Sequence, residues 1–213
     1  MFNEQDHYYM ALAIKLAKQG HYTTSPNPRV GCVLVHEETI NGATVSTQII
    51  GTGFHQKAGQ GHAEVNALLD AKINHPQLIK GSTAYVTLEP CSHFGKTPPC
   101  AQALINAQVK RVVAAMVDPN PEVSGRGLAM LEQAGIETAF GLLESEAKLL
   151  NTGFINLMTK ALPYVRVKLA ASLDGKTAMK SGESKWITSN QARCDVQKLR
   201  AQSCAIITGA DTV

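Results

Sequence analysis

The sequence has no block of charge of one sign and no long apolar run. Lys and Arg number 20 against 17 Asp and Glu, a formal net charge of +3, and the basic residues are scattered. Such dispersed charge argues against wholesale binding to nucleic acid or to a membrane surface. Apolar runs such as residues 112–117 fall far short of the ~20 residues that span a bilayer, so we expect no transmembrane helix.

Two features of secreted proteins are also missing. Residues 1–7 carry acidic side chains where a signal peptide has basic ones, and no apolar segment follows them. The cysteines number five, an odd count in a chain large enough to fold without disulfide bonds. We therefore expect a cytoplasmic protein in which any clustered cysteines bind a metal or take part in chemistry.

The hydrophobic pattern predicts a folded α/β protein. Hydrophobic residues make up 44% and charged ones 17%, enough apolar material for a packed core. Periodicity predicts helices over residues 4–20, 62–72, 125–134 and 144–160 and from residue 98, and strands over 30–35, 47–53, 82–88, 111–117 and 136–140. Alternating strands and helices predict a three-layer α-β-α domain over residues 1–160.

A second domain is expected over residues 161–213. The alternation restarts with an expected strand at 164–169, a helix at 190–202 and a strand at 204–208. Because two strands alone are marginal in water, we expect this segment to be part of a domain that is either cut short in this chain or completed by something absent from it.

Four residues carry the chemistry. His62 and Glu64 stand at the start of an expected helix, and Cys91 and Cys100 flank the start of the next. One imidazole and two thiolates suit tetrahedral Zn²⁺ with the fourth position left for water. Zinc brings the pKa of such a water towards ~7, and the Glu64 carboxylate is placed to move its proton.

The order of these residues is similar to the signature of zinc nucleobase deaminases, His-x-Glu followed by Pro-Cys-x-x-Cys. The sequence departs from that template at the second cysteine, because eight residues separate Cys91 from Cys100. On the general template this insertion leaves open whether the third ligand is Cys100 or His93, the nearest substitute.

The insertion itself points to a subgroup. Residues 87–100 have the sequence TLEPCSHFGKTPPC. This stretch resembles the zinc motif of the bifunctional riboflavin-biosynthesis proteins, which join a pyrimidine deaminase to a reductase. Further similar stretches are 26–31 (PNPRVG), 53–55 (GFH), 62–64 (HAE) and 118–121 (DPNP). Residues 167–176 (VKLAASLDGK) and 184–188 (SKWIT) resemble the opening of that family's reductase.

The resemblance implies a cytidine-deaminase-like domain followed by the beginning of a dihydrofolate-reductase-like α/β domain. The implied reaction is zinc-dependent deamination of 2,5-diamino-6-(5-phosphoribosylamino)pyrimidin-4(3H)-one to 5-amino-6-(5-phosphoribosylamino)uracil. NADPH reduction of the ribosyl group to ribityl would belong to the full-length protein. The implied partners are a small phosphorylated pyrimidine and a second copy of the chain.

The resemblance also implies roles for single residues. His62, Cys91 and Cys100 would hold zinc, and Glu64 would be the catalytic proton shuttle. The implied contacts are Asn27 and His55 to the pyrimidine, Lys96 and Asn120 to the ribose phosphate, Ser184 and Arg200 to the reductase substrate, and Ala170, Trp186 and Thr212 to NADPH.

Plainer interpretations stand beside these roles. Lys96 could be a solvated loop charge, and Asn27 and Asn120, each between prolines, could serve turn geometry alone. We expect the remaining cysteines not to be ligands: Cys32, Cys194 and Cys204.

Two other functions fit the zinc residues. One is deamination of another nucleobase or nucleoside, free or in RNA, which the lack of a basic stripe disfavours for RNA. The other is a zinc-stabilised binding module in which Glu64 has no catalytic role.

Overall fold

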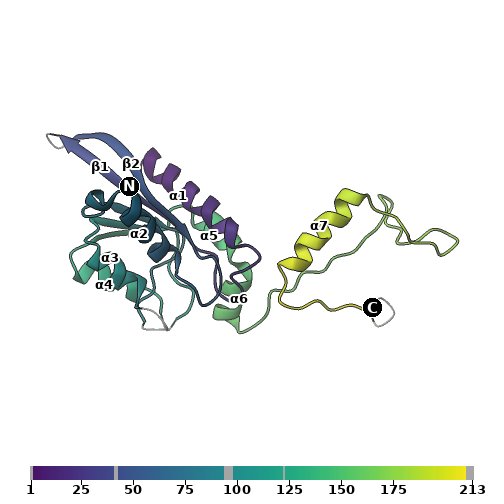
Figure 1. Cartoon of the computed structure of the whole chain (residues 1–213). Helices are drawn as coiled ribbons and strands as arrows, with labels where there is room; N and C mark the ends of the chain where they lie inside the picture. Colours follow the sequence, from purple (N-terminus) through teal and green to yellow (C-terminus); the bar gives the residue numbers. More distant parts are fainter. Residues whose placement is uncertain (1, 41–42, 94–97, 122, 210–213) are drawn as a thin grey trace. The chain divides into compact units, whose positions relative to one another are not determined.

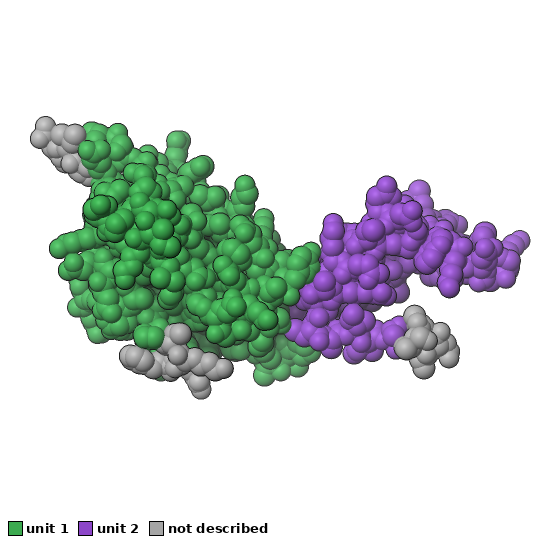
Figure 2. Space-filling view, viewed as in Figure 1, with its two compact units in different colours: residues 1–163 green, residues 164–213 purple. Residues whose placement is uncertain are grey.

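The computed structural model describes residues 2–40, 43–93, 98–121 and 123–209 (Figure 1). The chain forms two compact units, Met1–Pro163 and Tyr164–Val213, called unit 1 and unit 2 below (Figure 2). Among the described residues, no helix has the length and apolar character needed to cross a bilayer.

Unit 1 is built on a five-stranded mixed sheet in the order β2-β1-β3-β4-β5. The antiparallel hairpin of β1 and β2 pairs through β1 with β3, while β3, β4 and β5 run parallel. The strands are β1 (Gly31–Ile40), β2 (Ala43–Phe54), β3 (Thr83–Val86), β4 (Arg111–Ala114) and β5 (Glu137–Phe140). The segments that follow β3 and β4 therefore leave the sheet at one edge, where α/β proteins build their sites.

Helices cover both faces of the sheet, which confirms the predicted three-layer α-β-α fold. Helices α1 and α5 contact each other on one face, and α2, α3 and α4 form a contacting row on the other (Figure 1). The helices of unit 1 are α1 (Glu4–Ala17), α2 (Ala63–Asn74), α3 (Cys100–Asn106), α4 (Arg126–Gln133), α5 (Glu144–Leu150) and α6 (Thr152–Lys160), with 3-10 turns at Lys18–Gly20 and Pro76–Leu78.

Glycines let two helices lie directly on the hairpin backbone. A Cβ atom at Gly31 would lie 2.0 Å from the Ala13 carbonyl oxygen of α1, so only glycine fits there. On the opposite face, a Cβ at Gly53 would lie 2.4 Å from the Ala63 carbonyl oxygen of α2. This close approach fixes where α2 begins, and so where His62 and Glu64 stand.

The helix predicted over residues 144–160 is two helices that break at Asn151. The Leu150 carbonyl, which a continuous helix would use, accepts a hydrogen bond from the Arg29 guanidinium at 2.5 Å. Asn151 makes two further bonds to the Arg29 backbone, Oδ1 accepting from N–H at 2.8 Å and Nδ2 donating to the carbonyl at 2.9 Å. Contacts across 122 residues of sequence override the local helical pattern.

Unit 2 departs further from the prediction. Residues 190–202 contain the expected helix, α7 (Asn190–Ala201), whose first turn is capped by the Ser189 hydroxyl. The strands predicted at 164–169 and 204–208 are wrong, since residues 164–209 as described contain no strand. No residue in that range is buried, and Leu169 and Ile207 are more than four-fifths exposed. Without a neighbouring strand, the β-type sequence has no partner for its backbone.

A buried ion pair joins the first helix to the sheet. The Asp6 carboxylate accepts hydrogen bonds from the Arg111 guanidinium and from the Tyr85 hydroxyl, both at 2.7 Å. Burial by itself raises the pKa of Asp6, but the bonds from Arg111, from a backbone amide and from Tyr85 outweigh it and lower that pKa. The pair lies at the first residue of β4, away from the edge where the strand ends.

We expect Asp6→Asn to lower the free energy of unfolding of unit 1 by about 2–4 kcal/mol near pH 7, because Arg111 loses its buried partner. A depressed pKa contributes stability that is present above the unfolded-state value of about 4 and is lost as pH falls through the lower folded-state value. The difference between wild type and variant should therefore shrink below about pH 4. Urea unfolding at several pH values measures it, with Glu137→Gln, an exposed partner of the same arginine, as control. A difference that stays constant down to pH 3 would contradict the prediction.

Candidate active site

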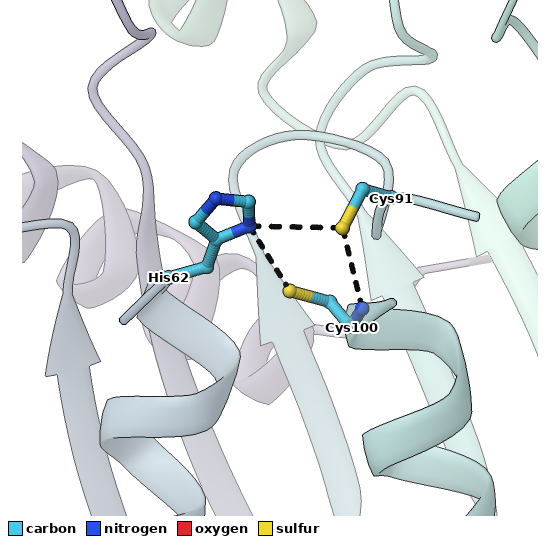
Figure 3. Close-up of side chains that lie close together, drawn as sticks. All are labelled: His62, Cys91 and Cys100. Carbon is cyan, nitrogen blue, oxygen red and sulfur yellow. Dashed lines mark hydrogen bonds between the residues drawn. The ribbon is translucent and has the colours of Figure 1, made fainter. Parts of the chain in front are cut away.

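Two helix N-termini and one loop bring the predicted metal ligands together (Figure 3). His62 is the residue before α2, and Cys100 is the first residue of α3. Cys91 comes from the segment that follows β3, and its side chain faces the other two. The three side chains thus stand at the edge of the sheet where β3 ends.

The distances fit a zinc ion. His62 Nδ1 lies 3.3 Å from Cys100 Sγ and 3.6 Å from Cys91 Sγ, and all three ligand atoms lie within 4.8 Å of one another. Tetrahedral zinc with ordinary Zn–N and Zn–S bonds separates such nitrogen and sulfur atoms by about 3.5 Å. Cys100 Sγ therefore lies at ligand distance from the His62 ring despite the long insertion. His93, the alternative on the general template, is not part of the cluster of described ligand groups.

The cluster favours a thiolate. Hydrogen bonding from Cys100 lowers the pKa of Cys91, and the Cys100 backbone N–H donates to Cys91 Sγ at 3.2 Å. The hydrogen bond between the Cys100 and Cys91 side chains, together with burial, raises the pKa of Cys100. The hydrogen bond to Cys91 also raises the pKa of His62, although burial opposes it. The Cys91 side chain is thus favoured as the negatively charged thiolate, the form of cysteine that binds a metal cation.

Glu64 lies in the first turn of α2 and is 3% exposed. Burial, followed by the charge of Cys91, raises the pKa of Glu64 to about 7. A carboxyl group with such a pKa can both hold and release a proton near neutral pH, which a general acid and base must do. Beneath it lies Cys32 of β1, fully buried, whose thiol pKa is raised by burial and by Glu64.

Asn27 and His55 lie beside the candidate metal ligands. The His55 ring is 3% exposed and stacks edge-to-face on His62 with centroids 5.4 Å apart. Its Nδ1 lies 3.1 Å from the Gly61 carbonyl, so Nδ1 carries the proton and Nε2 accepts from Asn27 Nδ2 at 3.1 Å. Burial lowers the pKa of His55, which keeps the ring neutral. The Asn27 carboxamide is thereby held in one orientation.

The remaining predicted contacts are spread over the chain. Asn120 lies in the loop after β4, where its backbone N–H donates to Asp118 Oδ1 at 2.8 Å. Lys96 and Thr212 lie outside the described residues. The other four predicted contacts all belong to unit 2: Ala170, Ser184, Trp186 and Arg200. The interactions described there do not join these four to one another; Trp186 has Arg193 over its ring, 4.3 Å from the centroid.

One buried group beside the cluster, Glu89, has no role predicted from the sequence. The Glu89 carboxylate, 3% exposed, accepts hydrogen bonds from four backbone N–H groups in the segment after β4. The signal in the sequence is a glutamate two residues before a candidate metal-binding cysteine. Nothing in the sequence shows what it bonds to, because its partners lie 29–39 residues further along the chain.

Two family models match the chain. The cytidine and deoxycytidylate deaminase zinc-binding region matches residues 3–116, and the RibD C-terminal domain matches residues 163–213. The first match covers the complete set of candidate ligands and Glu64.

Curated and solved relatives agree with these models. Riboflavin biosynthesis protein RibD of Escherichia coli (strain K12) is 59% identical over 98% of this chain and 53% of its own length. The structure of Acinetobacter baumannii RibD, form 1, is 57% identical over 98% of this chain and 55% of that one, with a TM-score of 0.87. The structure of a Thermotoga maritima diaminohydroxyphosphoribosylaminopyrimidine deaminase/5-amino-6-(5-phosphoribosylamino)uracil reductase is 43% identical. The match covers 92% of this chain and 52% of that one, with a TM-score of 0.80. The chain thus spans about half the length of each of these three relatives.

We expect wild-type protein to bind about one zinc ion per chain and Cys91→Ser to bind it at least about 100-fold more weakly, because loss of a ligand should cost more than loss of an outer contact. Metal analysis after dialysis against graded chelator concentrations measures this. Cys194→Ser is the matched control, since Cys194 is exposed in unit 2. Equal zinc affinity in the two variants would exclude Cys91 as a ligand.

Proposed function

The chain belongs to the cytidine and deoxycytidylate deaminase family, in the group of the bifunctional riboflavin biosynthesis proteins, and from that premise we propose that unit 1 is a deaminase of riboflavin biosynthesis. Its substrate would be 2,5-diamino-6-(5-phosphoribosylamino)pyrimidin-4(3H)-one and its products 5-amino-6-(5-phosphoribosylamino)uracil and ammonia. The observation that carries the proposal is the buried Glu64 carboxyl beside three side chains at zinc-ligand distances.

His62 Nδ1, Cys91 Sγ and Cys100 Sγ would hold the zinc ion. Zinc bound there supplies a Lewis acid that makes water acidic enough to act as a nucleophile near neutral pH. The Glu64 carboxylate takes a proton from the attacking water and returns it to the departing amino group, which leaves as ammonia. Because Glu64 is shielded from bulk water, it exchanges that proton with the reacting groups.

Asn27 and His55 would orient the pyrimidine. The neutral His55 ring accepts from Asn27 Nδ2, which turns the carboxamide oxygen of Asn27 away from the histidine. That oxygen is then the acceptor for an N–H donor on the pyrimidine edge. Lys96 and Asn120 would contact the ribose phosphate, where an ammonium group suits a phosphate dianion.

The reductase step is proposed for the whole protein, of which unit 2 would be one part. Ala170, Trp186 and Thr212 would contact NADPH, and Ser184 and Arg200 the substrate, as the match of residues 163–213 to the RibD C-terminal domain supports. A cytoplasmic location and a homodimer belong to the same proposal.

We expect Glu64→Gln to lower ammonia release from the diaminopyrimidine ribotide by a factor of about 100 or more, because the amide cannot transfer the proton. The variant should remain folded and keep its zinc, since Glu64 is not among the ligands. Ammonia assays with metal analysis on the same samples measure both. Glu132→Gln, on the outer face of α4, is the matched control.

The alternatives predict different results in the same assay. Release from a free nucleoside but not from the ribotide would indicate another deaminase substrate. A folded, zinc-loaded protein that is inactive on both, and unchanged by Glu64→Gln, would favour a zinc-stabilised binding module.

NADPH binding can be tested separately, because Trp186 is the single tryptophan of the sequence. Its ring is 70% exposed, so a nicotinamide cofactor that contacts it should quench its fluorescence. We expect saturable quenching on NADPH titration, with weaker quenching by NADH as the control. The absence of a saturable change up to millimolar NADPH would contradict the assignment of Trp186.

A further inference from the structure

Glu89 lies between β3 and the metal ligand Cys91 and has no part in the mechanism above. Its side chain is 3% exposed, and its backbone N–H donates to the Met116 carbonyl at 2.9 Å. This bond sets the segment after β3 beside the segment after β4. A carboxylate buried at such a place needs hydrogen-bond donors.

The donors are four backbone N–H groups, which belong to the loop after β4 and to the N-terminus of α4. Glu89 Oε2 accepts from Asp118, in the loop after β4, at 3.0 Å and from Gly125 at 2.9 Å. Oε1 accepts from Gly127 at 2.8 Å and Leu128 at 3.4 Å, both in the first turn of α4. One carboxylate therefore holds both the loop after β4, through Asp118, and the N-terminus of α4, through the other three donors.

The neighbouring residue is held equally closely. A Cβ atom at Gly127 would lie 1.9 Å from the Pro90 carbonyl oxygen and 3.2 Å from Glu89 Oε1. The start of α4 is thus pressed against the residue that immediately precedes Cys91. Any shift of α4 or of the Asp118 loop must move Pro90, and with it the metal ligand.

The same bonds reach the proposed phosphate side of the site. Asp118, whose N–H is held by Glu89, accepts the Asn120 N–H on Oδ1 at 2.8 Å. The path from Cys91 through Glu89 and Asp118 to Asn120 is continuous. A helix cap alone would account for the bonds from Gly125, the N-cap residue of α4, and from its first turn, whereas Asp118 lies outside that helix and its cap.

We propose that Glu89 is a positioning residue that holds the zinc ligand Cys91 and the substrate-contacting loop at Asn120 in one fixed arrangement. The Asn120 part of this inference rests on the proposed function, and the Cys91 part rests on the geometry of the ligands. Glu89 acts through the backbone of both segments and touches neither zinc nor substrate.

Glu89→Gln tests the proposal with little change of shape. The amide nitrogen would face two N–H donors that it cannot accept, so either the loop or the helix is released. We expect zinc release to a chelator to become about tenfold faster, as for loss of a supporting contact behind a ligand. KM for the ribotide should rise about tenfold with a smaller change in kcat, and Glu89→Asp, which keeps the carboxylate on a shorter arm, should lie in between.

Asp6→Asn is the control for general loss of stability, because Asp6 acts at the opposite end of β4. It should lower the unfolding midpoint without changing zinc release or KM. Zinc release in Glu89→Gln within twofold of wild type would overturn the proposal, and so would equally fast release in Asp6→Asn. If Glu89→Gln does not fold, Glu89→Asp decides: wild-type zinc release and KM in that variant would leave Glu89 a purely structural role.

Two readouts need no substrate. Zinc release and hydrogen exchange of the amides of Asp118 and Gly125 should both be faster in Glu89→Gln, whether or not the ribotide is turned over. Failure of the wild type to release ammonia would count against the proposed function alone. Unchanged amide exchange and zinc release would count against the role of Glu89 alone.

Discussion

The close packing of α2 on the hairpin backbone is the constraint on which the site depends. Gly51 and Gly53 of β2 leave no room for a side chain, because a Cβ at either would lie within 2.4 Å of a carbonyl oxygen of α2. The facing helix positions are alanines that are fully buried, Ala63, Ala67 and Ala71. Because small residues lie on both sides of this contact, close packing allows only one distance between α2 and the hairpin backbone. That distance determines how far the N-terminus of α2, which carries His62 and Glu64, lies from the end of β3.

The sequence was informative wherever chemistry is carried by a short stretch of chain. His62 and Glu64 stand two residues apart, and the long insertion between Cys91 and Cys100 could be read as a specific feature. The order of strands and helices in unit 1 also followed from periodicity, because those elements bury one face against a common core. Local pattern and tertiary structure agree at these places.

Where the prediction was wrong or incomplete, a contact distant in sequence decides the structure. The break at Asn151 depends on Arg29, and the partners of Glu89 lie beyond β4. Neither pairing leaves a periodic signal, since a hydrogen bond to backbone does not depend on the identity of the partner residue. The strands predicted in unit 2 show the opposite case: residues 164–169 have the composition of a strand, but among the described residues they have no strand to pair with. Propensity alone does not supply the hydrogen bonds that a strand needs.

Two buried glutamates beside the cluster show how environment assigns different roles to one side chain. Glu89 and Glu64 are each 3% exposed, so exposure does not distinguish them. Glu89 is surrounded by four backbone donors, which satisfy both of its oxygens. Glu64 instead faces Cys91 and Cys100, and burial and the charge of Cys91 raise its pKa to about 7. A carboxylate with fixed donors is suited to hold segments of chain together, whereas one with a labile proton near neutral pH is suited to acid and base chemistry.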